Sequence, residues 1–486
     1  MLKKGYLFLL WLSYGLTATA QPIPYPKEVQ AKIQQVEQRL ASHIRLPDDN
    51  DWTIQERMTY YNVPGLSVAV VHNFQIEWAK AYGWTYAEKH RPMTTETRFQ
   101  AGRLSQALHA VGVLVQLQDK KIDLTTDINT YLTSWKFPYD SVAKGKKINL
   151  AQLLSHRAGL RPTRFPGYSV GAPLPNVIQI LEGQKPANNS AVRSGFEPGI
   201  RTVYSGGGPM IAQQLLTDVT GQPYDQYMWE RVLKPLGMVN SSFTQPPGKE
   251  NDLASGHDFA GRVVAGQYQV FPEQAATGLW TTPTDLARYM VEMQRAYGGK
   301  SSQVLTPEMA RLQLTPDAGG PTALGLQSFP KGPNPIFLAA EGPYTAGFNI
   351  FFLGSLTDGY GAVILINSDT GFIASELLNS IARVYQWPDF YRPTMRQTVV
   401  VPEAVLEAYV GDYQEGNRIY TITRENNRLF EHVKGSSRAE LFPESQSQFF
   451  FRSFNAEIEF IRDASGKVVK RTMVYNGQRS EAQRIN

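Results

Sequence analysis

The chain has 486 residues, a length that suggests two or three domains of ordinary size. Apolar residues make up 42% and charged residues 19%, which excludes a disordered chain and allows large buried cores. The formal net charge of +5 is too small, and the basic residues are too scattered, to indicate binding to nucleic acid. The absence of cysteine excludes disulfides, so we expect the core alone to stabilise the fold.

The N-terminal segment has the pattern of a secretory signal peptide. Lys3 and Lys4 precede an apolar run over residues 6–16, and an Ala-Thr-Ala sequence at 18–20 offers a cleavage site. The run is shorter than the roughly 20 residues that span a membrane, which favours cleavage over an uncleaved anchor. Removal of residues 1–20 takes away two lysines and no acid, and lowers the net charge from +5 to +3. We therefore expect an exported bacterial protein, periplasmic or secreted, with no transmembrane segment after cleavage.

The first predicted elements are one helix and two strands. Apolar residues recur at helical spacing over residues 27–44, which predicts an amphipathic entry helix. Residues 64–71 and 76–83 are strand-like runs, and the short segment between them, residues 72–74, predicts a hairpin turn.

The middle of the chain is predicted to be helical. Between Leu104 and Val115, apolar residues recur at intervals of three and four, which predicts a helix with a broad buried face. A second helix is predicted to begin after Thr282, because Thr282 can cap it, Pro283 fits its first turn and Asp285 favours its positive end.

A second pair of strands is predicted late in the chain, at residues 348–353 and 361–366, with an Asp-Gly turn between them. Strands from both ends of a domain that enclose a helical middle predict one antiparallel sheet, closed by distant segments. From about residue 400 onward, short alternating runs separated by turns predict a small β-rich domain.

These patterns predict an α+β fold: an antiparallel sheet flanked by helices, a mostly helical subdomain and a small all-β, barrel-like C-terminal domain. The expected domains are a signal peptide at 1–20, a main domain at 21–390 and the β-rich domain at 398–486.

Several ordered sequence blocks resemble signatures of one enzyme family. Residues 30–385 resemble the serine β-lactamase and penicillin-binding-protein family, in its class C and esterase-like branch. The last 85 or so residues resemble the small barrel-like domain that many members carry. The blocks are Thr97–Gly102, Lys121–Leu124, Asn129–Leu132, Leu153–Leu160, Tyr204–Gly208, Pro235–Met238 and Gly278–Thr282.

The resemblance implies three elements that carry chemistry. The first is Ser-x-x-Lys at the start of the central helix, where the Lys amine deprotonates the Ser hydroxyl one turn away. The second is a Tyr that relays protons, followed by Asn or by a Ser-Gly sequence. The third is a strand with Lys/His-x-Gly, whose cation holds the substrate carboxylate and whose edge forms part of the oxyanion hole.

The first element is lost in this sequence. The alignment places Arg103 at the nucleophile position and Gln106 at the Lys position. A guanidinium stays protonated, with a pKa above about 12, and cannot attack a carbonyl. An amide cannot act as a base. The sequence therefore predicts a hydrolase fold without its nucleophile and base.

The second element is retained and the third is changed. Tyr204 keeps the family position and a Gly-rich loop follows it, while Glu341 stands where the cation belongs and Pro343 where its glycine belongs. The charges are thus inverted relative to the family, with a cation at 103 and a carboxylate at 341. We hypothesise that Arg103 and Glu341 form an ion pair across the former active site; a solvated Arg103 at the cleft rim is the alternative.

Other hydroxyls offer weak alternatives as nucleophiles. Ser105 is two residues along the helix from Arg103, so its side chain points about 200° away from the cleft. Ser205, next to Tyr204, is more typical of a turn. We interpret His156 as a residue that fixes a helix end. The seven histidines show no metal-binding spacing, so we expect no metal and no cofactor.

Two hypotheses on function follow. The first is an exported member of the family that lacks catalysis and acts as a binding or regulatory module, for a cell-wall peptide or another periplasmic protein. In it, Arg103 would hold a ligand carboxylate. The alternative is an active serine hydrolase (an esterase, a D,D-peptidase or a β-lactamase-type enzyme) with relocated catalytic residues. Whether the chain is an enzyme stays open at this point.

Overall fold

The computed structural model describes residues 25–248, 252–316, 320–331, 334–433, 438–475 and 477–485. The predicted signal peptide lies outside these ranges. Within them, no helix combines the length and the apolar character that a membrane crossing requires.

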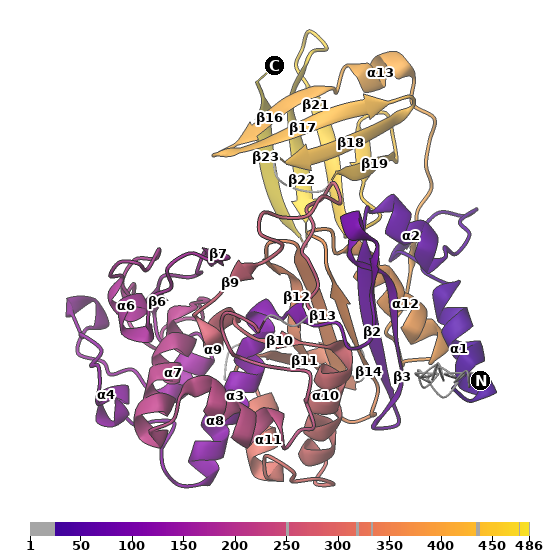
Figure 1. Cartoon of the computed structure of the whole chain (residues 1–486). Coiled ribbons are helices and arrows are strands. Elements are labelled where there is room, and N and C mark those ends of the chain that lie inside the picture. Colours follow the sequence, from indigo (N-terminus) through magenta and orange to yellow (C-terminus); the bar gives the residue numbers. More distant parts are fainter. Residues whose placement is uncertain are drawn as a thin grey trace, which may run out of the picture.

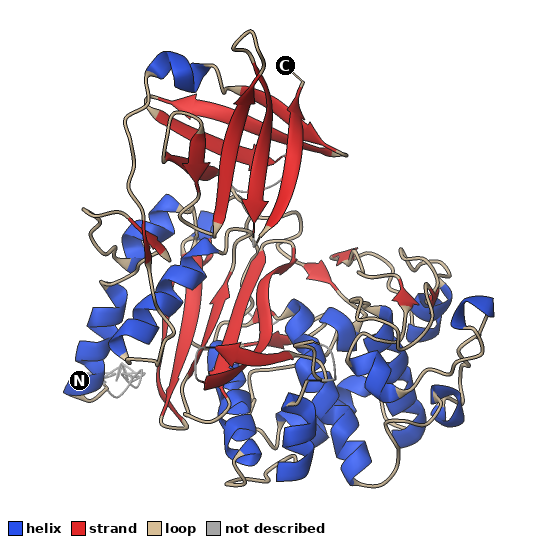
Figure 2. Ribbon diagram, turned by 180° about the vertical axis from the view of Figure 1, so that it is seen from behind, coloured by secondary structure: helices blue, strands red, loops and turns tan. Residues whose placement is uncertain are grey.

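A seven-stranded antiparallel sheet forms the centre of the main domain (Figures 1 and 2). The strands β2 (Gly65–His72) and β3 (Gln75–Tyr86) form the predicted hairpin. Strand β2 also pairs with β14 (Gly361–Ile366), which comes late in the chain, and Val68 lies opposite Ile364. The prediction that distant segments close one antiparallel sheet is therefore confirmed. In spatial order the strands are β11 (Gln327–Lys331), β12 (Asn334–Thr345), β13 (Phe348–Ser355), β14 (Gly361–Ile366), β2 (Gly65–His72), β3 (Gln75–Tyr86) and β4 (Arg91–Pro92).

Both faces of the sheet are buried, because its central strands alternate between two apolar cores. Val68 and Val70 of β2 point into a core formed with the terminal helices, whereas Ala69 and Val71 point into the larger core beneath the helical lobe. The sheet thus separates two helical layers, which Figure 1 shows on its two sides. The helices of the first layer are α1 (Lys27–Glu37), α2 (Ile54–Tyr60) and α12 (Phe372–Val384).

The helical lobe covers the other face (Figure 2). Its helices are α3 (Ser105–Gln118), α4 (Ile128–Tyr131), α5 (Leu150–Leu154), α6 (Val177–Glu182), α7 (Gly207–Thr220), α8 (Tyr224–Met228), α9 (Gln274–Thr277), α10 (Pro283–Tyr297) and α11 (Pro307–Leu314). Short strands in two-stranded pairs border this layer: β5 (Phe99–Gln100) with β10 (Trp280–Thr281), β6 (Leu160–Arg161) with β8 (Arg193–Ser194), and β7 (Tyr168–Ser169) with β9 (Gln269–Val270).

Two predicted helices are confirmed and one is shorter than predicted. Helix α3 covers the apolar run after residue 104, and the Thr282 hydroxyl accepts from the backbone N–H of Asp285 at 3.2 Å, as expected for the cap of α10. The entry helix was predicted to reach residue 44, but α1 ends at Glu37. The reason is that Leu40 exchanges two backbone hydrogen bonds of 2.9 Å with Trp52, which pulls the chain into an extended course.

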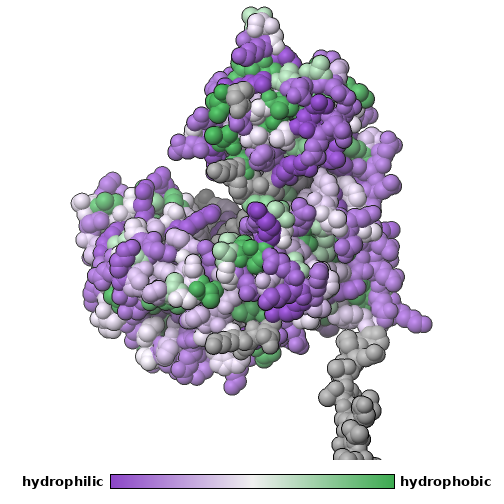
Figure 3. Space-filling view, turned by 45° about the horizontal axis from the view of Figure 1, so that its top comes forward, coloured by the Kyte–Doolittle hydropathy of each residue, from purple (hydrophilic) through white to green (hydrophobic). Residues whose placement is uncertain are grey.

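The C-terminal β-rich prediction is also confirmed, since eight antiparallel strands form a closed barrel. The barrel lies at one end of the sheet, at the top of Figure 1, and α13 (Glu403–Glu407) precedes it. In Figure 3 the surface is mostly hydrophilic and is hollowed between the barrel and the helical lobe. The strands are β16 (Gly411–Glu415), β17 (Arg418–Glu425), β18 (Arg428–Val433), β19 (Ala439–Pro443), β20 (Gln448–Phe450), β21 (Ala456–Arg462), β22 (Val468–Tyr475) and β23 (Gln478–Arg484).

One close backbone contact fixes the start of α3. Gly325 has φ +79, and a Cβ on it would lie 2.4 Å from the carbonyl oxygen of Gln106. Only glycine allows this approach without moving one of the two segments.

We predict that Gly325→Ala lowers the free energy of unfolding by more than about 2 kcal/mol, because backbone strain and a steric clash add. Gly221→Ala is the matched control. Gly221 has a similar φ of +68 but open space around it, so only the strain of roughly 1 kcal/mol applies. Urea denaturation measures both. Equal losses in the two variants would contradict the close packing of Gly325 against α3.

Candidate functional site

Arg103 and Gln106 lie at the N-terminal end of the central helix, one turn apart. Arg103 belongs to a short 3₁₀ turn, η2 (Gly102–Leu104), that runs directly into α3, and Gln106 is in the first turn of α3. The preceding Ala101 donates its N–H to the carbonyl of Leu279 at 2.8 Å, which ties this start to the segment before β10. Strand β12 passes beside η2.

The side chain of Gln106 is buried, and its amide nitrogen makes two hydrogen bonds, whereas its amide oxygen has no partner among the described residues. Its Nε2 donates to the Tyr204 hydroxyl at 2.9 Å and to the carbonyl oxygen of Ala276 at 3.2 Å. Ala276 belongs to α9, so the amide links three separate segments of the lobe. An amide nitrogen whose two hydrogens are donated offers no basic electron pair. The position that the family resemblance assigns to a base therefore holds a hydrogen-bond donor.

The ring of Tyr204 contacts both a cation and an imidazole. The Arg103 guanidinium carbon is 5.2 Å from the ring centroid, and the His156 ring centroid is 4.6 Å away. His156 Nδ1 accepts from the backbone N–H of Ser205 at 3.4 Å. Burial, and next the charge of Arg103, lower the pKa of His156 to about 3, so this imidazole stays neutral at physiological pH. Its φ of 58° just beyond α5 also fits the predicted role at a helix end.

The two alternative serines are buried and already bonded. The Ser105 hydroxyl donates to the Gly102 carbonyl at 2.6 Å and accepts from Leu279 N–H at 3.1 Å. The Ser205 hydroxyl donates to the Pro162 carbonyl at 3.0 Å and accepts from Gly207 N–H at 3.2 Å. A nucleophile needs a base that takes its proton, and both hydroxyl protons are held by backbone carbonyls instead. Neither serine lines the cavity described next.

A cavity of about 410 Å³ opens beside Arg103 and Tyr204. Its remaining lining comes from Thr163, Arg164, Phe165, Val203, Gly206 and Thr277. Among all the lining residues, Arg103 and Arg164 carry positive charge and none carries negative charge. Among the side chains that the structure describes, no carboxylate pairs with Arg103 or Arg164, and Arg103 Nε is buried without a hydrogen-bond partner. The cavity is thus electropositive and has aromatic walls.

The sequence anticipated only part of this cavity. Arg103 and Tyr204 were candidates, whereas Arg164, Phe165 and Thr277 were not. Arg164 and Phe165 follow the Leu153–Leu160 block, and Thr277 precedes the Gly278–Thr282 block. No feature of their own distinguished these three residues from other loop residues. The folding of these two blocks toward α3 brings them together.

Two candidates fall on strand β12. The backbone of Glu341 pairs with Phe351 and that of Pro343 with Asn349, so both lie on the strand that passes beside η2. The side chains of Glu341 and Pro343 lie outside the described residues. The ion pair between Arg103 and Glu341 therefore stays a prediction. In the described part of the chain, no group of three His, Cys, Asp or Glu side chains could hold a metal ion.

Glu273 is a buried acid near the cavity that no pattern in the sequence indicated. Glu273 directly precedes α9, whose Ala276 and Thr277 contact Gln106 and the cavity, and it is fully buried. Its two carboxyl oxygens have no hydrogen-bond partner within the described ranges. Burial raises the pKa of Glu273 to about 8, so the carboxyl is largely protonated at neutral pH.

We predict that Glu273→Gln stabilises the protein more at high pH than at low pH. Between pH 4.5 and about 8 the folded state keeps a proton that the unfolded state releases, so the wild-type free energy of unfolding falls as pH rises. Glutamine does not titrate, so the variant does not lose stability in this way. The difference in the free energy of unfolding between Glu273→Gln and the wild type should therefore grow by about 2 kcal/mol or more across that window. Urea denaturation at several pH values measures it. Glu308→Gln removes an exposed carboxyl as the control; a pH-independent difference at 273 would contradict the burial.

Comparisons with known proteins agree with this architecture. Residues 51–385 match the family described as Beta-lactamase, and residues 396–484 match a domain of unknown function, DUF3471. A beta-lactamase of Pseudomonas fluorescens is 28% identical over 243 residues, which are 49% of this chain and 62% of that protein. The protein flp of Staphylococcus aureus (strain MRSA252) is 23% identical over 343 residues, 68% of this chain and 65% of its own length. The chain thus spans less than two thirds of the length of these relatives.

A solved structure supports the fold. The octameric penicillin-binding protein homologue from Pyrococcus abyssi superposes with a TM-score of 0.55 at 20% identity, and covers 88% of this chain and 98% of its own. At this identity the likeness concerns the fold alone. Because the family match covers more than half of the chain, this protein belongs to the β-lactamase family, with the fold of the penicillin-binding-protein-like serine hydrolases and a DUF3471 domain at its C-terminal end.

Proposed function

We propose that this chain is a non-catalytic member of the β-lactamase family that acts as a binding or regulatory module. The observation that carries the proposal is the Gln106 amide, which donates to Tyr204 and to the Ala276 carbonyl in the place of the base. Arg103 stands in the place of the nucleophile and is permanently protonated. Without a nucleophile and a base, acyl transfer has no first step.

The cavity beside Arg103 and Tyr204 has the features that a binding site needs. Its volume falls within the range of small-molecule sites, and its aromatic walls can hold an apolar body. Two arginines supply charge-assisted donors for an anionic group, and Arg103 lies where the family's substrates react. These features favour a ligand with a carboxylate, such as a cell-wall peptide or a segment of another periplasmic protein. The signal-peptide pattern of residues 1–20 is consistent with that location.

We predict that the purified protein forms no covalent adduct with a fluorescent penicillin or with a fluorophosphonate probe, because both need an activated hydroxyl. Labelling followed by gel fluorescence and intact mass measures this. The positive control is the double variant Arg103→Ser with Gln106→Lys, which should become labelled. Arg103→Ser alone should react at least about 100-fold more slowly, since it lacks the base.

One result would contradict the non-catalytic role, and another would extend the loss of function to further residues. Labelling of the wild type that disappears in Ser105→Ala or Ser205→Ala would establish a hydrolase with relocated residues. A folded double variant that stays unlabelled would mean that the loss extends beyond the nucleophile pair to the strand that carries Glu341 and Pro343.

We further predict that muropeptide fragments with a free carboxylate raise the unfolding temperature of the wild type, whereas amidated fragments do not. Arg103→Gln should weaken binding about tenfold or more, because a charge-assisted hydrogen bond is lost. Arg295→Gln, an exposed arginine on α10 outside the cavity lining, is the matched control and should bind as the wild type does. Equal binding by all three proteins would show that Arg103 takes no part.

A further inference from the structure

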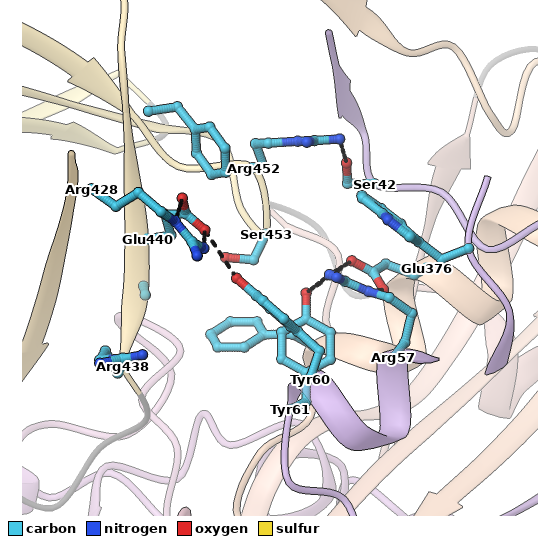
Figure 4. Close-up of a pocket in the computed structure, with 14 residues that line it drawn as sticks. Ser42, Arg57, Tyr60, Tyr61, Glu376, Arg428, Arg438, Glu440, Arg452 and Ser453 are labelled. Atoms are coloured by element: carbon cyan, nitrogen blue, oxygen red, sulfur yellow. Dashed lines mark hydrogen bonds and ion pairs between the residues drawn. The ribbon is translucent and has the colours of Figure 1, made fainter. Parts of the chain in front are cut away.

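A second cavity, of about 310 Å³, lies in the seam between the main domain and the barrel (Figure 4). Helix α2 and the first two turns of α12 line one side of it, together with Ser42 and Trp52. Strands β18 and β19 and the turn after β20 line the other side. Neither the cleft residues nor the family's chemistry involve this seam, so it requires its own explanation.

The main-domain wall is built around Arg57. Its guanidinium donates to both carboxyl oxygens of Glu376, with Nε at 2.6 Å and Nη2 at 2.5 Å, and the Tyr61 hydroxyl donates to the same carboxylate at 2.8 Å. The Arg57 guanidinium carbon lies 4.1 to 4.4 Å from the centroids of the Trp52, Tyr60 and Tyr61 rings. These contacts hold the wall rigid and align aromatic surface along it.

The barrel wall carries a second arginine–carboxylate pair. Arg428 donates through Nε to Glu440 at 2.5 Å and also through Nη2. In Figure 4 the Tyr60 hydroxyl points across the seam toward Glu440, to which it donates at 3.3 Å. Ser453 points from the barrel turn toward the same space. The two walls are joined by this bond and by a second one, which Arg452 of the barrel donates to the Ser42 hydroxyl at 3.4 Å.

Two more arginines complete the lining. The carboxylates that pair with them are not part of the lining. Arg438 lies 3.9 Å from the Phe430 ring and donates through Nη1 and Nη2 to Glu425. Arg452 pairs with Asp49 through Nη2. Glu425 and Asp49 are not part of the lining, so four arginines face the cavity against two glutamates. The cavity has an excess of positive charge that fits an anion.

The remaining lining narrows the class of anion. The Glu440 carboxylate can accept from hydroxyl groups, and the Ser453 hydroxyl can accept or donate. The Phe442 and Tyr61 rings offer flat apolar faces. A bare inorganic anion would use only the arginines. A ring that carries hydroxyls on its edge, C–H groups on its face and one acidic group would use all three kinds of contact.

We propose that this seam is a binding site for an acidic sugar residue, a hexose unit that carries a carboxylate or a phosphate. The acidic group lies between Arg428 and Arg438, whose Nη1 and Nε respectively make no hydrogen bond to the described residues. The sugar hydroxyls meet Glu440 and Ser453, and the ring rests on the aromatic wall. Because the walls come from two domains, a bound sugar also joins the barrel to the main domain.

The test is binding to the full chain, measured by calorimetry with glucuronate, glucose 6-phosphate, glucose and inorganic phosphate. We expect both acids to bind, and glucose and phosphate alone to bind at least about tenfold more weakly. Arg438→Gln should weaken binding of the acids about tenfold; its partner Glu425 is exposed, so folding is preserved. Arg479→Gln, an exposed barrel arginine outside the lining, is the matched control and should leave binding unchanged.

The four compounds distinguish a carboxylate sugar from a phosphorylated one, and together with the two variants they show whether the proposal fails. Preference for glucuronate indicates a carboxylate sugar, and preference for glucose 6-phosphate indicates a phosphorylated one. Phosphate that binds as well as the sugar acids would overturn the sugar assignment. Equal weakening in Arg438→Gln and Arg479→Gln, or the absence of binding by either acid to the folded wild type, would overturn the site itself.

Discussion

The hydrogen bond from the Gln106 amide to the Tyr204 hydroxyl is the contact on which the rest of the cleft depends. It occupies the centre of the lobe, and the same amide reaches the Ala276 carbonyl, so three segments meet at one side chain. A lysine amine at this point could exchange a proton with the tyrosine. An amide donates and accepts hydrogen bonds but takes up no proton at physiological pH. In the proposed non-catalytic role, the Gln106 amide is structural, and Arg103 beside it adds charge without acting as a nucleophile.

The fold itself is independent of that chemistry. The central sheet alternates apolar residues into two cores, α3 runs through the larger one, and neither feature needs a serine at position 103. A chain can therefore keep the fold of this family with a guanidinium at position 103, where the resemblance expects the nucleophile. In the proposed non-catalytic role, fold and function separate because the packing depends on many residues and the acyl chemistry on two.

Much of the architecture could be predicted from sequence, since it rests on local periodicity. The β2–β3 hairpin, the pairing of distant strands, α3, the cap of α10 and the C-terminal barrel all followed from apolar spacing and turn residues. The length of α1 did not, because the bridge between Leu40 and Trp52 is a tertiary contact. The family resemblance, and not local periodicity, singled out Arg103, Gln106 and Tyr204. The burial of Glu273, and the arginine-rich seam, arise from segments that meet only after folding, and no local pattern marks them.

We expect the cavity beside Arg103 to be electropositive and to bind its ligand without reacting. The most direct test of this central claim is a crystal structure of the protein after prolonged soaking with a penicillin. The predicted result is Gln106 Nε2 within hydrogen-bond distance of the Tyr204 oxygen, with no continuous density between the drug and any side chain. Continuous density from a serine hydroxyl to an opened β-lactam ring would contradict it.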